Sequence, residues 1–157
     1  MRSDREKSYF LLDLDSFADW PERVALPTQH YVLAVFANVS HIAPEEIAVA
    51  MRAALTSGAV YVVAWGPGCQ VIHDICDELR FELDLDKEEG ATIITTWHSD
   101  EPVAEAVWFF ANSAFPDDAF AETCKSWLAV RVGECRDILD IDAYLADPRR
   151  LDAAVDL

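Results

Sequence analysis

The sequence has few basic residues. It contains 12 lysines and arginines against 29 aspartates and glutamates, which gives a net charge of −17 over 157 residues. A field of this sign repels phosphate backbones and anionic lipid headgroups. We therefore expect neither a nucleic-acid partner nor a membrane partner.

Long apolar runs and cysteine pairs are also missing. No run approaches the roughly 18 apolar residues of a membrane span, and the apolar stretch 9–12 is too short for the core of a secretory signal. The cysteines form no CxxC pair. These absences predict a cytoplasmic protein with reduced thiols at Cys69, Cys76, Cys124 and Cys135.

The chain has enough apolar residues to form a hydrophobic core, since 52% of its residues are hydrophobic and 11% are aromatic. This composition excludes a disordered chain, a collagen and a disulfide-stapled miniprotein. The length predicts one domain over residues 1–157. Within it we expect an N-terminal extension or edge strand at 1–30, a core at 31–133 and a helical segment at 134–157.

Strand-length apolar runs alternate with helical patterns in the core. Strands are predicted at 31–37, 59–65, 92–97 and 127–132, and the first two are continuous apolar runs without polar alternation, which predicts burial on both faces. Helices are predicted from Pro44 to Gly58, after the Gly66-Pro67-Gly68 turn, and from Pro102. This order predicts a Rossmann-like, three-layer α/β sandwich with a mainly parallel sheet of four or five strands. Residues 10–12 would supply the edge strand, and Ile138, Ile141 and Leu145 suit a helix that ends near Pro148, before a last turn at 151–155.

Ligands of parallel sheets bind beyond the carboxyl ends of the strands, where this chain places polar side chains. The catalytic candidates there are Cys69, His73, Asp74, His98, Asp100 and Glu101. Cys69 begins a helix, which favours a thiolate, and His73 four residues later could serve as its base. The ordinary alternative is a small buried cysteine beside a hydrogen-bonded histidine.

The same edge carries weak candidates for a metal site, namely Cys69, His73, His98 and Cys135. Only the first two have a spacing that places them together on a helix, and the others join them only if the topology is right. The Gly66-Pro67-Gly68 turn matches neither nucleotide-binding glycine pattern. We therefore assign no metal and expect no cofactor.

The stretch FLLDLDS at residues 10–16 resembles the first motif of haloacid-dehalogenase-type phosphatases. The resemblance implies a nucleophile at Asp13 and an acid/base at Asp15. The later motifs of that family require a lysine before an acidic pair, whereas Asp117 and Asp118 precede Lys125 here. A solvated Asp-x-Asp is the ordinary explanation of this stretch.

Aromatic and acidic residues suggest a surface for a partner. The candidates for a ligand or partner surface are Trp65, Trp97, Trp108 and Phe109, and the segment 107–111 is apolar around most of its helix. Residues 74–90 and 98–122 each carry a net charge of −6. The ordinary role of such acids is solubility, and the functional alternative is docking of a basic partner.

Four segments together resemble an uncharacterised bacterial family, a domain of unknown function. They are WGPGC at 65–69 with His73-Asp74, TTWHSDEP at 95–102, WFF at 108–110 and AFPDD at 114–118. The resemblance spans about residues 31–133. It implies no activity.

These observations predict an acidic binding or regulatory module, more a recognition protein than an enzyme. We expect it to recognise a protein with a basic surface, or to self-associate; an immunity or defence accessory protein would have this character. The alternative is a small enzyme or ligand sensor, hydrolase-type or metal-assisted, with its site at the carboxyl ends of the strands.

Overall fold

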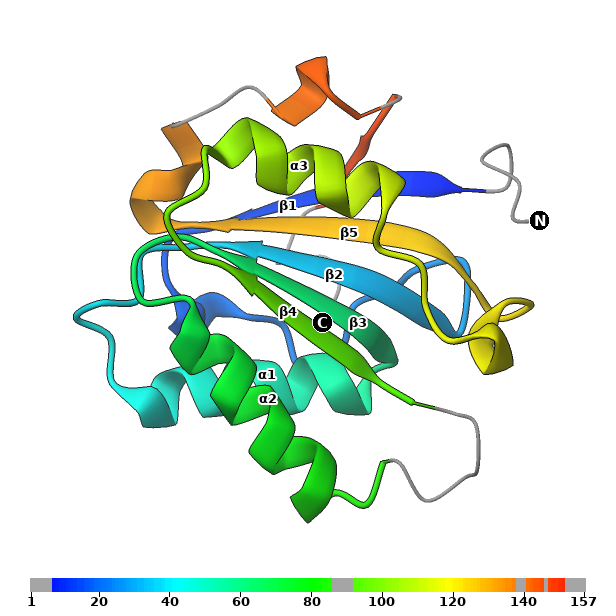
Figure 1. The fold of residues 1–157 in the computed structure, drawn as a ribbon, viewed down its shortest axis with the longest axis horizontal. Helices are drawn as coiled ribbons and strands as arrows, with labels where there is room; N and C mark the ends of the chain where they lie inside the picture. Colours follow the sequence, from blue (N-terminus) through cyan, green and yellow to red (C-terminus); the bar gives the residue numbers. More distant parts are fainter. Residues whose placement is uncertain (1–6, 86–91, 138–140, 146, 152–157) are drawn as a thin grey trace.

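A computed structural model describes residues 7–85, 92–137, 141–145 and 147–151 and shows helices on both faces of a parallel sheet (Figure 1). The strands are β1 (Ser8–Leu14), β2 (His30–Phe36), β3 (Ala59–Trp65), β4 (Ile94–His98), β5 (Cys124–Val132) and β6 (Arg149–Leu151). The helices are α1 (Pro44–Thr56), α2 (Gln70–Glu82) and α3 (Val103–Asn112). The strand order is β4-β3-β2-β5-β1-β6, and every described pair is parallel.

Two hydrophobic clusters separate the layers of the sandwich. On one face α1 and α2 pack Ile47, Met51 and Ile72 against alternate residues of the central strands. On the other face Phe110 of α3 and Ile141 pack against the remaining residues of those strands. Both sets of strand side chains are therefore buried, which explains the continuous apolar runs. The predicted α/β sandwich is confirmed, with a sheet of six strands instead of four or five.

The strand predicted at residues 10–12 exists, but its predicted place at an edge is wrong. It is β1, which pairs with β5 on one side and with β6 on the other. Phe10, Leu11 and Leu12 are at most 2% exposed because clusters cover both faces of this strand. The first residues of the described chain therefore belong to the interior of the sheet.

The C-terminal segment also differs from the prediction of one helix. Short 3-10 helices at Gly133–Asp137 and Ile141–Ala143 precede the edge strand β6. Ile141 and Leu145 are buried against the α3 face, whereas Ile138 and residues 152–155 of the predicted last turn lie outside the described residues. Pairing of Arg149 with Phe10 extends the chain after Pro148 through Leu151.

The loops after β2 and β3 are joined by backbone hydrogen bonds at the carboxyl edge of the sheet. The amide of Val39 donates to the carbonyl of Pro67 over 2.9 Å, and the amide of Ala37 donates to that of Trp65 over 3.1 Å. Gly66 lies between them with a φ of +124°, and a Cβ there would stand 1.9 Å from the Ala37 oxygen. The turn after β3 is hydrogen-bonded through its backbone to the loop after β2, and this close approach gives Gly66 a structural role.

Replacing Gly66 should therefore destabilise the fold. We expect Gly66→Ala to lower the free energy of unfolding by about 3 kcal/mol, because the new methyl group adds a steric clash to an unfavourable φ. Gly133→Ala is the matched control, since its φ is also positive but the nearest atom is 3.6 Å away. It should cost about 1 kcal/mol. Equal losses in urea unfolding would contradict the steric argument.

Candidate functional site

The predicted site at the carboxyl ends of the strands is divided by the sheet. His73 of α2 packs on Trp97, with ring centroids 4.4 Å apart, and its Nδ1 lies 2.5 Å from the Thr95 hydroxyl. His98 packs on Phe109 of α3 at 4.6 Å. Because successive residues of β4 point to opposite faces, the two histidines lie on opposite sides of the sheet. The structure does not bring them together.

The cysteines of the predicted site are likewise buried in different layers. Cys69 caps α2 in the α1 and α2 cluster, with its Sγ 3.6 Å from the Ser99 hydroxyl. Cys135 lies in the α3 cluster, where burial and the nearby Glu134 raise the pKa of its thiol to about 11. Across the part of the chain that the structure describes, no three His, Cys, Asp or Glu residues are grouped to hold a metal.

The carboxylates of the predicted site have separate surroundings. Asp74 and Asp100 are exposed, on α2 and on the turn after β4. Glu101 is partly buried, and its Oε2 lies 3.1 Å from the His98 Nδ1. The carboxylate that does contact His73 is that of Asp77, whose Oδ2 lies 3.2 Å from the His73 Nε2.

Asp13, the nucleophile that the phosphatase resemblance implies, is held in an ion pair. Its two carboxylate oxygens accept from Nε and NH2 of Arg131 over 2.7 and 2.9 Å. The two residues are direct neighbours across β1 and β5, and Arg131 is only 7% exposed. A carboxylate used in this way neutralises a buried guanidinium, which explains the aspartate in an apolar strand.

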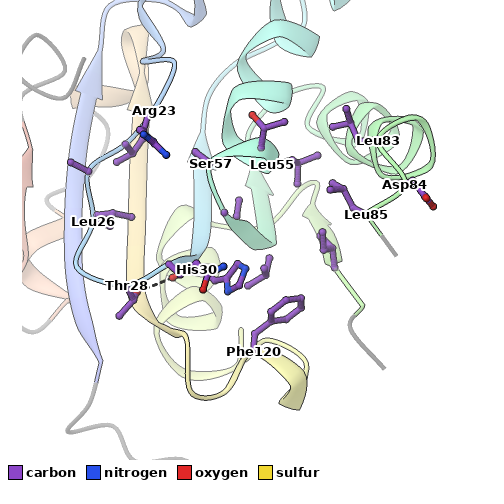
Figure 2. Close-up of a pocket in the computed structure, with 18 residues that line it drawn as sticks. Arg23, Leu26, Thr28, His30, Leu55, Ser57, Leu83, Asp84, Leu85 and Phe120 are labelled. Carbon is purple, nitrogen blue, oxygen red and sulfur yellow. Dashed lines mark hydrogen bonds between the residues drawn. The ribbon is translucent and has the colours of Figure 1, made fainter. Parts of the chain in front are cut away.

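An open cavity of about 750 Å³ lies at the amino ends of β2 and β3, the opposite end of the sheet from the predicted site (Figure 2). Its walls are formed by the connection from β1 to β2, the ends of α1 and α2, Ile93 before β4, and Phe120 of the 3-10 helix Asp118–Phe120. Lining side chains labelled in Figure 2 include Arg23, Leu26, Thr28, His30, Leu55, Ser57, Leu83, Leu85 and Phe120. The volume suits a small organic molecule.

Polar groups in the cavity are held by fixed partners. The Nδ1 of His30 lies 2.7 Å from the Thr123 hydroxyl, and its ring packs on Phe120 with centroids 4.9 Å apart. Burial lowers the pKa of His30, so the ring favours its neutral form. The Ser57 hydroxyl lies 2.9 Å from that of Tyr31, whose pKa burial raises to about 12. The Tyr31 phenol therefore stays protonated, and it donates to the Ala54 carbonyl over 3.1 Å.

Sequence reasoning missed this cavity because no motif marks it. Its polar groups come from residues just before two strands, and its apolar wall comes from the ends of two helices. The only local signal is the pair Ser57-Gly58 between α1 and β3. A Cβ at Gly58 would stand 2.3 Å from the Gln29 oxygen. Glycine therefore allows the two cavity-lining backbone segments at residues 29 and 58 to approach each other closely.

A third region combines the exposed aromatic and acidic residues, and we call it the β4 face. It comprises the edge strand β4, the outer side of α2 on one face of the sheet, and the β4–α3 connection with the outer side of α3 on the other face. Trp97 is 42% exposed and Trp108 is 60% exposed. The other two aromatic candidates are partly buried: the Trp65 indole donates to the Glu101 carbonyl over 2.8 Å, and Phe109 packs on His98. Exposed acids on the β4 face are Asp74, Asp77, Glu78, Asp100 and Glu105.

Comparisons with known proteins give one finding about family. Residues 9–148 match the family model described as Domain of unknown function (DUF7684). This confirms the resemblance to a family of unknown function and extends it beyond residues 31–133. No curated protein and no solved structure matches the chain. No helix in the described ranges is long and apolar enough to cross a membrane.

The lowered pKa of His30 makes a prediction about stability. As the pH falls through about 6.5, the unfolded chain takes up this proton before the folded chain does, so stability is lost. The free energy of unfolding should therefore fall more steeply for wild type than for His30→Gln between about pH 7.5 and 5.5. Urea unfolding at each pH measures it. His41→Gln, at an exposed residue, is the control and should follow wild type; equal slopes in His30→Gln and wild type would contradict the prediction.

Proposed function

We propose that this chain, which belongs to the Domain of unknown function (DUF7684) family, is an acidic module that binds a basic partner protein through the β4 face. The observation that carries the proposal is the exposure of a tryptophan with carboxylates on each face of the sheet, Trp97 with the acids of α2 on one face and Trp108 with those near the start of α3 on the other. A catalytic role has no comparable support, because the carboxyl-end candidates lie on separate faces of the sheet.

The charge around the β4 face is strongly one-sided. Residues 88–124 contain no lysine or arginine. On α2, the guanidinium of Arg80 lies 3.1 Å from the Asp77 carboxylate, and Arg52 of α1 pairs with Glu82. Both of these arginines are therefore paired with carboxylates, and the excess of acids in residues 74–90 and 98–122 gives a negative field. Such a field speeds association with a basic surface and excludes acidic ones.

Carboxylates accompany β4 along its whole length. The Asp117 carboxylate accepts from the Thr92 amide over 3.3 Å, just before the strand begins. Asp77 accepts from the Thr95 hydroxyl over 3.3 Å, and Glu101 meets His98 at the end of the strand. A partner segment beside β4 would meet an acid at each position.

The exposed tryptophans would supply the apolar part of the contact. Large rings that exclude water dominate the binding energy of many interfaces, and their faces also attract lysine and arginine. Trp127, by contrast, is 3% exposed and closes the core. Its burial shows that exposure is not general for tryptophan in this chain.

Neutralising the acids should weaken partner binding. In Asp74→Asn/Glu78→Gln/Asp100→Asn/Glu105→Gln, we expect a tenfold to hundredfold loss of affinity, since each exposed charge contributes up to about 1 kcal/mol. The partner is the protein crosslinked to the chain in its host, then purified and measured by calorimetry at two salt concentrations. Weakening by added salt should be smaller in the variant.

The matched control makes the same change of four charges elsewhere, in Asp19→Asn/Glu22→Gln/Glu45→Gln/Glu46→Gln. It should bind within about twofold of wild type, because these residues lie on the β1–β2 connection and the start of α1. Equal weakening by both variants would mean that only net charge matters. A strictly monomeric chain with no basic partner would reject the proposal.

Binding of a small ligand is the second candidate function, and the 750 Å³ cavity favours it. Native mass spectrometry of the chain from its host should then show a retained small-molecule mass. We expect His30→Ala, inside the cavity, to lose that mass and His73→Ala to keep it. If His73→Ala loses the mass and His30→Ala keeps it, the ligand binds at the carboxyl ends of the strands instead.

A further inference from the structure

β4 is an edge strand with one partner. It pairs with β3 from Tyr61–Ile94 to Trp65–His98, and the strand order ends there. An edge strand presents a row of amides and carbonyls on its outer side, which another extended chain can use. The side chains of Ile94, Thr95 and Thr96 are only partly buried, and within the described residues no further strand pairs with β4.

We propose that the partner of this chain adds an extended, lysine- or arginine-rich segment to the sheet by pairing with β4. The inference rests on the proposed function and names its binding mode, β-strand addition. The segment would be about five residues long, matching β4. Main-chain hydrogen bonds would supply affinity, and the flanking acids would select basic side chains.

The two edges of the sheet are built differently, and the difference supports the proposal. Proteins protect exposed edges with charged residues, proline or bulges. The opposite edge, β6, carries two exposed arginines in three residues, Arg149 and Arg150. β4 has the sequence ITTWH, which is rich in strand-forming residues and contains no lysine, arginine or proline. Protection by residues of the strand itself is therefore present at β6 and absent at β4.

The acids lie where an added strand would place its side chains. Neighbouring strands are about 4.8 Å apart, and side chains directly opposite on one face interact. On the α2 face of β4 the added strand would meet Asp77, whose carboxylate also contacts Thr95, Arg80 and His73. On the α3 face it would meet Glu101, which contacts His98. Basic residues on both faces of the partner strand would thus find a carboxylate.

The same arrangement disfavours a second copy as the occupant. Pairing of β4 with another β4 would bring the Asp77 and Glu101 carboxylates of two chains together. Like charges on neighbouring strands are destabilising, and each copy carries a net charge of −17. The negative field that repels a second copy of this chain attracts a basic strand.

Two peptides of equal charge test the binding mode. The probe is acetyl-KKVTVKK-amide, which has lysines on both faces of a strand, and its control has the same sequence with every interior amide N-methylated, which removes the donors on both edges. We expect the probe to bind the intact chain, to slow amide hydrogen exchange at residues 94–98, and to bind at least tenfold more tightly than the control. Fluorescence of the tryptophans gives the dissociation constants.

The outcomes separate the two proposals. Equal binding of both peptides, with no protection of residues 94–98, overturns strand addition and leaves recognition of a basic partner standing. If neither peptide binds while the crosslinked partner does so in a manner that depends on the β4-face acids, strand addition is likewise overturned. Protection of residues 94–98 in a dimer without peptide overturns it in favour of a second copy.

Variants of the chain keep the test independent of the peptide chemistry. Trp97→Lys adds to β4 the charge that protects β6, so the probe should bind at least tenfold more weakly. Val49→Lys makes the same charge change at a 72% exposed residue of α1 and should leave binding unchanged. If both variants bind the probe equally weakly, the loss of affinity comes from the change in net charge, and this result would contradict strand addition at β4.

Discussion

The position of β5 between β1 and β2 is the constraint on which the rest of the structure depends. Its residues pair with β1 from Ser8 to Leu14 and with β2 from His30 to Phe36. The register sets Arg131 beside Asp13, and the buried guanidinium needs that carboxylate, because an unpaired charge in this position is costly. Two segments more than a hundred residues apart must therefore meet before the sheet is complete.

The place of β5 also determines where β4 lies. From β2 the chain moves outward to β3 and β4 with α1 and α2 on one face, and it returns to β5 with α3 on the other. β4 thus ends the sheet between helices of different layers. This separates His73 from His98 and sets the acids of α2 and of the β4–α3 connection on either side of one strand.

Local patterns predicted the elements because each has a local cause. Pro44 and Gly58 bracket α1, and the uninterrupted runs that became β2 and β3 are buried on both faces. Strand order has no such local signal, so residues 10–12 were expected at an edge although β1 lies inside the sheet. The carboxyl-end candidates failed to converge because the alternation along β4 decides which face each side chain joins. The cavity could not be predicted, since its walls come from segment ends without a motif.

Under the proposed binding mode, the carboxylates beside β4 and the unprotected edge of β4 have a common explanation. An unprotected edge is normally a liability, because copies of the chain can pair along it. In this chain the protection at β6 is local, two arginines on the strand, whereas at β4 it comes from carboxylates beside the strand. Carboxylates beside the strand repel another acidic edge and attract a basic one, while arginines on the strand would obstruct both. The acids would then have two roles: they would keep the free chain soluble, and they would select a basic partner.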